Sequence, residues 1–197
     1  MTPDPRGDLE PELEQFLAAG PPPVYVGFGS MPTPDPVAVA RDVVSVLGRL
    51  GVRGVLSEGL AGLAVPPGSG VGAAAGSSVI GVSATSHEAL FHRCAAVVHH
   101  GGAGTTAAAL RAGVPQVVVP HAADQPYWGR RMADLGVAAE PIARKDLTPE
   151  RLQRALDVAL SRGARDAAYR LGERVRPEDG AGDAARLIHG HLSSRVG

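Results

Sequence analysis

The sequence predicts an α/β fold, in which a doubly wound parallel sheet of about six strands carries helices on both faces. Short apolar runs recur along the chain, and stretches with helical spacing separate one run from the next. These runs are apolar throughout rather than alternating, which is typical of strands buried on both faces. They comprise residues 24–28, 52–56, 78–82, 95–99, 116–119 and 137–139. Strands and helices that alternate in this way give a parallel, Rossmann-like sheet.

Capping signals indicate where the intervening helices begin and end. Asp35 followed by Pro36 is typical of an N-cap with proline in the first turn, and Thr85 with Glu88 matches a capping box. Glycines at 113 and 136 are placed as C-caps. The predicted helices start at 36, 85, 105, 125, 149 and 181, and a short helix is compatible with residues 9–18.

Length and composition restrict the class of protein. A chain of 197 residues is long enough for one domain with flanking segments, and the proline-rich residues 1–22 have the composition of a linker. The net charge of −1 gives no electrostatic case for a nucleic-acid partner. The single cysteine, Cys94, excludes a disulfide framework within the chain and any multi-cysteine metal site. Without an apolar run of membrane-spanning length or a signal peptide, we expect no transmembrane segment and a cytoplasmic location.

The strongest local feature is the segment 95–113, in which a buried strand enters a glycine-rich turn that opens into a helix. The first N–H groups of a helix lack internal partners, and the helix dipole adds positive charge there. With His100 beside it, this turn predicts a phosphate or pyrophosphate site. Two alternatives stay open: a tight turn with glycines for packing only, and a dinucleotide fingerprint, Gly102-x-Gly104-x-x-Ala107, with Asp124 as its acid.

Two further segments follow other predicted strands, where ligands of a doubly wound sheet bind. Ser30 offers a hydroxyl after the first strand. Asp124 and Gln125 follow the fifth, and a carboxylate beside an amide can hold vicinal hydroxyls, as a sugar requires. The alternative for Asp124 is that it only caps the following helix.

Together these segments resemble the C-terminal half of an inverting GT-B glycosyltransferase of the bacterial natural-product and sterol type. GFGSM, HHGGAGTT, RAGVPQVVVPH, DQPYWGRR and LT-x-ERL occur in the family's order and spacing. The resemblance covers about residues 12 to 190, and five motifs in register are highly specific. It implies residues 1–22 as an interdomain linker, 23–180 as a nucleotide-sugar-binding domain and 181–197 as a C-terminal crossover helix.

The resemblance also implies roles for single residues. The donor diphosphate would be held by Ser30, His100, Gly102, Ala103, Gly104 and Thr105, the donor sugar by Asp124 and Gln125, and the nucleobase near Thr85 and His87. Ser86 stands where the family usually has proline, and Ala108 stands where relatives that grip the ribose carry glutamate. The nucleotide is therefore open between uridine and thymidine diphosphate.

The implied function is transfer of a hexose or deoxyhexose from a UDP- or TDP-sugar to a hydroxyl acceptor, with inversion. No metal or other cofactor is implied, and the general base is expected in an acceptor-binding N-terminal domain, supplied in cis or in trans. The alternatives are a dinucleotide-binding oxidoreductase and a non-catalytic nucleotide-binding module. The helix over 181–192 is expected either to dock on its own domain or to self-associate.

Overall fold

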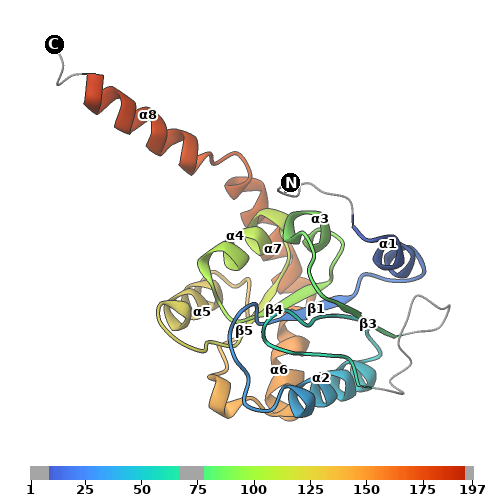
Figure 1. Ribbon diagram of the computed structural model, residues 1–197. Coiled ribbons are helices and arrows are strands. Elements are labelled where there is room, and N and C mark those ends of the chain that lie inside the picture. Colours follow the sequence, from blue (N-terminus) through green and yellow to red (C-terminus); the bar gives the residue numbers. More distant parts are fainter. Residues whose placement is uncertain (1–8, 67–77, 194–197) are drawn as a thin grey trace.

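The computed structural model describes residues 9–66 and 78–193, which form a five-stranded parallel sheet with helices on both faces (Figure 1). The strand order is β3-β2-β1-β4-β5. This confirms the predicted α/β class and the parallel, doubly wound sheet. The strands are β1 (Val24–Gly27), β2 (Gly54–Ser57), β3 (Val79–Val82), β4 (Ala96–His99) and β5 (Gln116–Val118).

Residues 137–139 were predicted to form a sixth strand, and this prediction is wrong. Ala138 forms one isolated parallel bridge with Gln116, so that the described sheet has five strands rather than six. The chain then reaches Pro141, which has no N–H for a ladder hydrogen bond. The apolar residues are nevertheless buried, since Val137 is 0% exposed and packs with Met132 and Ala168.

The helices largely begin and end where the capping signals place them. The N–H of Ala38 donates to Oδ1 of Asp35 at 2.9 Å, which confirms that cap. One cap is corrected: Ser86, not Thr85, accepts from Ala89 N. The helices are α1 (Pro11–Ala18), α2 (Pro36–Leu50), α3 (His87–Phe91), α4 (Ala103–Ala112), α5 (Gln125–Asp134), α6 (Pro149–Ala159), α7 (Arg162–Val175) and α8 (Gly180–Ser193), with a 3₁₀ turn, η1, at Arg144–Asp146.

Helix α7 was not predicted, because its buried side lacks the large apolar residues that form a recognisable stripe. Ala164, Ala168 and Gly172 are its buried residues. A Cβ on Gly172 would lie 2.8 Å from the carbonyl oxygen of Leu110, so α7 approaches α4 at backbone distance. Small residues give a weak sequence signal, although they allow the closest helix packing.

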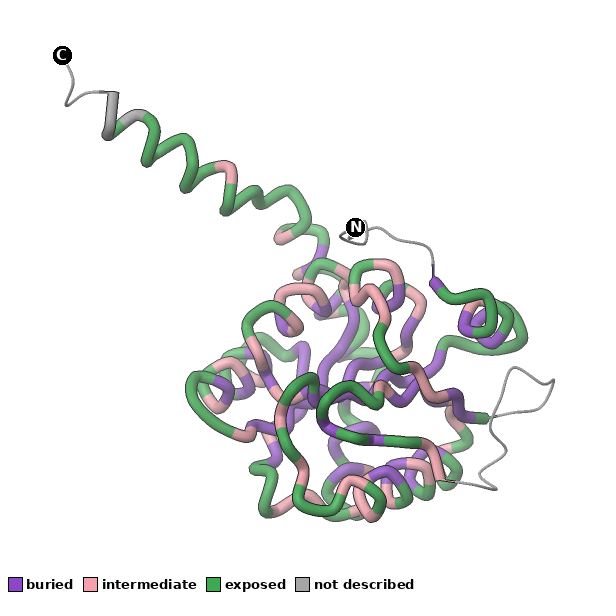
Figure 2. Tube along the Cα trace, in the orientation of Figure 1, coloured by how far each residue is buried: buried purple, intermediate pink, exposed green. Residues whose placement is uncertain are grey.

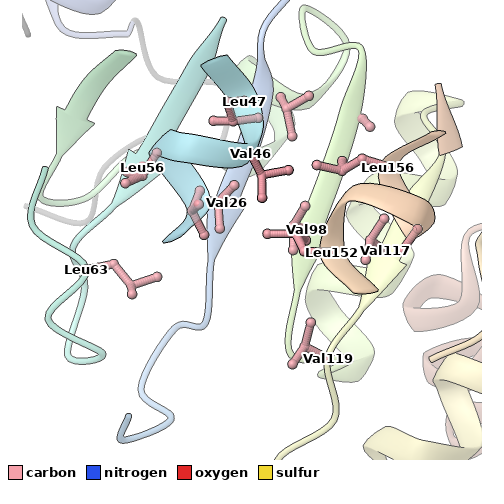
Figure 3. Packing of buried hydrophobic residues seen from close by; sticks show 14 of the residues in the cluster. Val26, Val46, Leu47, Leu56, Leu63, Val98, Val117, Val119, Leu152 and Leu156 are labelled. Atoms are coloured by element: carbon pink, nitrogen blue, oxygen red, sulfur yellow. The ribbon is translucent and has the colours of Figure 1, made fainter. Parts of the chain in front are cut away.

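Side chains of successive strand residues enter two cores on opposite faces of the sheet. Val24 and Val26 of β1 join a cluster with α2 and α6, whereas Tyr25 joins a cluster with α1, α3 and α4. Figure 3 shows the first cluster, in which Val46 and Leu47 of α2 and Leu152 and Leu156 of α6 cover the strands. Each face of the sheet is thus buried, as the apolar runs predict.

The two ends of the described chain differ in their packing. Leu13, Phe16 and Leu17 of α1 are buried against the sheet, whereas α8 projects away from the body with Leu187 75% and Ile188 61% exposed (Figure 2). The prediction that this last helix docks on its own domain is therefore wrong, and its self-association stays a prediction. The predicted domain boundaries also stay predictions. No helix among the described residues is both long and apolar enough to span a bilayer.

Candidate functional site

The sheet order places two candidate segments side by side. Strands β1 and β4 are neighbours, and the chain proceeds from β1 toward β2 and β3 on one side but from β4 toward β5 on the other. In open parallel sheets, ligands bind beyond the carboxyl ends of the strands at this reversal. Ser30 follows β1 on an exposed turn, and His100 follows β4 directly.

The turn between β4 and α4 leaves several backbone amides without protein acceptors. Gly102 is the N-cap of α4 and supplies no side-chain cap, and the first helical bond runs from Thr106 N to Gly102 O at 2.9 Å. Within residues 9–66 and 78–193, no protein atom accepts from the amides of Ala103, Gly104 or Thr105. The exposure of Ala103 and Gly104 leaves these donors open to a ligand, as the sequence predicts. That the ligand is a diphosphate stays a prediction.

His100 lies between two glycines beside these amides. A Cβ on Gly102 would lie 2.5 Å from Nε2 of His100, and a Cβ on Gly29 would lie 3.3 Å from its Cε1. A Cβ at position 102 would therefore displace the imidazole, and Gly29, at a φ of 60°, has a backbone conformation that other residues rarely adopt. Burial, and then the neighbouring His121, lower the pKa of His100. The ring is accordingly neutral at pH 7, and an anion bound beside it would favour the protonated form.

The predicted sugar-binding pair is divided between the surface and the interior. Asp124 is exposed, and its Oδ2 accepts from Nε1 of Trp128 at 2.8 Å. Although Asp124 occupies the N-cap position, its side chain makes no capping bond, which is contrary to the simple capping alternative. Gln125 is 6% exposed, and its Oε1 accepts from the amides of His121 and Ala122 at 2.7 and 3.0 Å. Its remaining donor, Nε2, faces Met31 Sδ at 3.4 Å.

The predicted nucleobase region is partly occupied by its own packing. The His87 ring stacks on Phe91 with centroids 4.5 Å apart, and its Nε2 lies 3.2 Å from the hydroxyl of Tyr25. Burial, and then His100, lower the pKa of His87. Thr85, just before α3, is partly exposed, as His87 is.

The comparisons with known proteins agree with this geometry. The family model "Erythromycin biosynthesis protein CIII-like, C-terminal domain" matches residues 73–182. The chain belongs to this family.

Curated relatives of the chain are glycosyltransferases. The vancomycin aglycone glucosyltransferase of Amycolatopsis orientalis is 44% identical over 95% of this chain and 43% of its own length. The sterol 3-beta-glucosyltransferase UGT80A2 of Arabidopsis thaliana is 37% identical over 93% of this chain and 28% of its own length. The chain thus spans less than half of these relatives.

Solved structures give the same result. The glycotransferase of kitacinnamycin superposes with a TM-score of 0.72 at 28% identity, covering 87% of this chain and 43% of that one. The glycosyltransferase VinC in complex with DTDP superposes with a TM-score of 0.63 at 27% identity, covering 88% and 43%. The resemblance to GT-B glycosyltransferases is confirmed, and the oxidoreductase alternative is not supported.

In this member of the erythromycin biosynthesis protein CIII-like family, a hollow of about 490 Å³ lies beside the loop that contains Asp124. Sequence reasoning did not single out its cationic lining. Nδ1 of His121 donates to Val119 O at 2.8 Å, which leaves Nε2 as an acceptor, and this nitrogen is buried with no hydrogen-bond partner among the described residues. The lining residues are Pro120, His121, Ala122, Ala123, Pro126, Arg130, Pro141, Ala143, Arg144 and Lys145.

Metal binding has no support in the described part of the chain. Among residues 9–66 and 78–193, no three histidine, cysteine, aspartate or glutamate side chains converge as a metal ion requires. Independence from a metal or other cofactor stays a prediction.

Proposed function

We propose that this chain is the donor-binding part of an inverting glycosyltransferase, which transfers a hexose or deoxyhexose from a UDP- or TDP-sugar to a hydroxyl acceptor. The free amides of Ala103, Gly104 and Thr105, beside His100 at the reversal of strand order, carry this proposal. The glycosyltransferase names of the relatives support it.

The site suits stabilisation of a leaving diphosphate. As the bond between the anomeric carbon and the phosphate oxygen breaks, negative charge grows on that oxygen. The free amides and the dipole of α4 are oriented toward this charge before the reaction, so they stabilise it without reorganisation. His100, protonated as the anion binds, would donate a charge-assisted hydrogen bond, and the exposed hydroxyl of Ser30 would add another.

The two sugar-binding candidates would act differently. Asp124 is exposed, and its Oδ2 already accepts from Trp128, so it would receive sugar hydroxyls with its free lone pairs. Gln125 would contribute through Nε2, whose acceptor within the described part of the chain is the weak thioether of Met31, while Oε1 keeps the loop in place. Thr85 and His87 would border the nucleobase.

The remaining steps would require a partner. We propose that an acceptor-binding N-terminal domain, in cis or in trans, deprotonates the acceptor hydroxyl, which attacks the anomeric carbon from the face opposite the diphosphate. A cytoplasmic location and independence from cofactors belong to the same proposal.

Calorimetric titration with UDP and TDP tests the donor site directly. We expect weak binding of at least one nucleotide, and a clear loss of affinity in His100→Ala. His92→Ala, which removes an exposed histidine at the end of α3, is the matched control and should bind as the wild type does. Absence of heat from both nucleotides, or equal binding by His100→Ala, would overturn the proposal.

A second measurement separates a transferase from a non-catalytic module. The chain is mixed with the acceptor-binding half of a related glycosyltransferase, its acceptor and the nucleotide sugar. Product formed only when both parts are present supports the transferase. Nucleotide binding without any product would favour the non-catalytic alternative.

A further inference from the structure

His99, the residue before the proposed phosphate-binding histidine, is completely buried at the end of β4. Its two ring nitrogens have different partners. The N–H of Gly101 donates to Nδ1 at 3.1 Å, and Nε2 lies 2.8 Å from Oε1 of Gln116. A backbone N–H can only donate, so Nδ1 must be unprotonated and Nε2 must carry the hydrogen. The network therefore fixes a single, neutral tautomer.

The orientation of Gln116 is fixed as well. Gln116 is fully buried on β5, and its Nε2 donates to Met132 Sδ at 3.7 Å. Its oxygen is thereby directed to His99. The chain Met132–Gln116–His99–Gly101 connects α5 and β5 to the glycine turn, and every hydrogen-bonding side chain in it is buried.

Gly101 connects this chain of hydrogen bonds to the glycine turn. Its φ of 90° lies in the region that glycine adopts easily. A Cβ there would lie 2.7 Å from Cγ1 of Val118 and 3.1 Å from the carbonyl oxygen of Gln125. His99 thus holds the amide of Gly101 inward, whereas the next amides, from Ala103 to Thr105, have no acceptor among the described residues.

We propose that His99 is a positioning residue for the donor diphosphate: its neutral imidazole anchors the Gly101 amide and so directs the following amides, and the adjacent His100, toward the ligand. This inference rests on the proposed function. The two neighbouring histidines then have separate tasks, since His99 holds the backbone and His100 meets the anion.

Burial supports this division. It lowers the pKa of His99 to about 4, against the opposing effect of the hydrogen bond that His99 donates to Gln116 and with smaller contributions from His100 and His87. His99 therefore stays neutral at neutral pH even when an anion binds nearby, and its Nδ1 remains an acceptor for Gly101.

Two substitutions separate the bonds of His99. In His99→Asn, the amide oxygen can take the place of Nδ1 and accept from Gly101. In His99→Gln, the longer side chain brings its amide to the place of Nε2, which keeps the contact with Gln116 and loses that with Gly101. We expect His99→Asn to bind UDP or TDP within about threefold of wild type and His99→Gln to bind about tenfold or more weakly in calorimetric titration. Equal affinities of the two variants, at comparable thermal stability, would overturn the proposal.

A measurement on the unsubstituted chain does not depend on how the variants fold. In a ¹⁵N-labelled sample, the N–H···N bond predicts a scalar coupling between the Gly101 amide nitrogen and Nδ1 of His99, present with and without nucleotide. Absence of this coupling would also overturn the proposal. If the wild type bound neither nucleotide, the proposed function itself would fail, and the role of His99 toward a diphosphate would fail with it. Nucleotide binding that His99→Gln leaves intact would refute the positioning role alone.

Discussion

Two strand-to-helix turns at the same edge of the sheet differ in whether their backbone amides have acceptors within the protein. After β5, the amides of His121 and Ala122 are both occupied by Oε1 of Gln125, a residue of the helix that follows. After β4, the N-cap is Gly102, and α4 begins with amides that no side chain caps.

The difference distinguishes a structural turn from a binding turn. Buried or partly buried backbone donors are normally paired, because an unpaired donor loses its hydrogen bonds to water. The β5–α5 turn satisfies the amides of His121 and Ala122 internally, and the exposed Asp124 lies beside them. In the β4–α4 turn, residues 101–104 are glycine and alanine, and no side chain caps the helix. The Gly101 amide donates to His99, but the amides from Ala103 to Thr105 depend on solvent or a ligand. The four predictions below test this contrast, from the largest expected effect to the smallest.

Gly101→Ala should have the largest effect, because it disrupts the open turn. The new Cβ would lie 2.7 Å from Val118 Cγ1 at a φ of 90°. Strain and overpacking together should cost about 3–5 kcal/mol in free energy of unfolding, measured by urea denaturation. Gly104→Ala is the control, since a Cβ there meets nothing within 4 Å. It should change stability by less than about 1 kcal/mol, in the stabilising direction. Equal destabilisation by both substitutions would contradict the assigned geometry.

The stability that the β4–α4 turn contributes should also depend on pH, because His99 titrates. Gln125, which holds the β5–α5 turn, has an amide side chain that does not titrate. The pKa of His99 is about 4 in the folded chain, below its ordinary value of 6.5, so the unfolded chain binds more protons between these values. The contribution of neutral His99 to the free energy of unfolding is therefore complete above pH 6.5. It declines by roughly 3 kcal/mol as the pH falls toward 4.

Denaturant titrations at several pH values measure this decline. Burial also lowers the pKa values of His87, His100 and His121, and these histidines add to the same trend. The comparison of wild type with His99→Asn isolates the contribution of His99. Identical slopes for the two proteins would contradict the assignment.

Gln125→Ala would open the second turn. Two amides would lose their acceptor, which should cost about 1–3 kcal/mol. Gln125→Glu keeps an acceptor and adds negative charge at the start of α5, where the helix dipole favours it, so most of the stability should remain. Thermal unfolding of both variants checks this order. A smaller loss of stability in the alanine variant than in the glutamate variant would contradict the role of Gln125 as the acceptor of these amides.

Asp124→Asn should have the smallest effect on stability. The side chain is exposed, and the asparagine oxygen can still accept from Trp128, so the free energy of unfolding should change by less than about 0.5 kcal/mol. UDP or TDP affinity should also stay unchanged, whereas sugar transfer in the reconstituted system should fall. Asp134→Asn, at the far end of α5, is the control and should leave transfer intact. Weaker nucleotide binding in Asp124→Asn would mean that this residue acts on the diphosphate rather than on the sugar.

Local signals in the sequence determined much of this protein. The apolar runs gave the positions of all five strands, because strands buried on both faces need uninterrupted apolar residues. Asp35 identified the start of α2, and the predicted start at 149 is that of α6, where Thr148 accepts from Arg151 N, since capping involves residues only three positions apart. The glycine turn and His100 were also evident, and five ordered motifs indicated the family that the comparisons show.

Only the tertiary structure decided which polar groups are already used. Gln125 approaches Met31, a residue 94 positions away, and His99 bonds to Gln116 across neighbouring strands. Neither pairing has a local signal, so the sequence could not show that these polar atoms of Gln125 and His99 already have partners. The same limit explains why α7, with its small buried residues, and the single bridge at Ala138 were misjudged. Sequence periodicity reports how apolar a segment is, whereas hydrogen-bond partners depend on which segments the fold brings together.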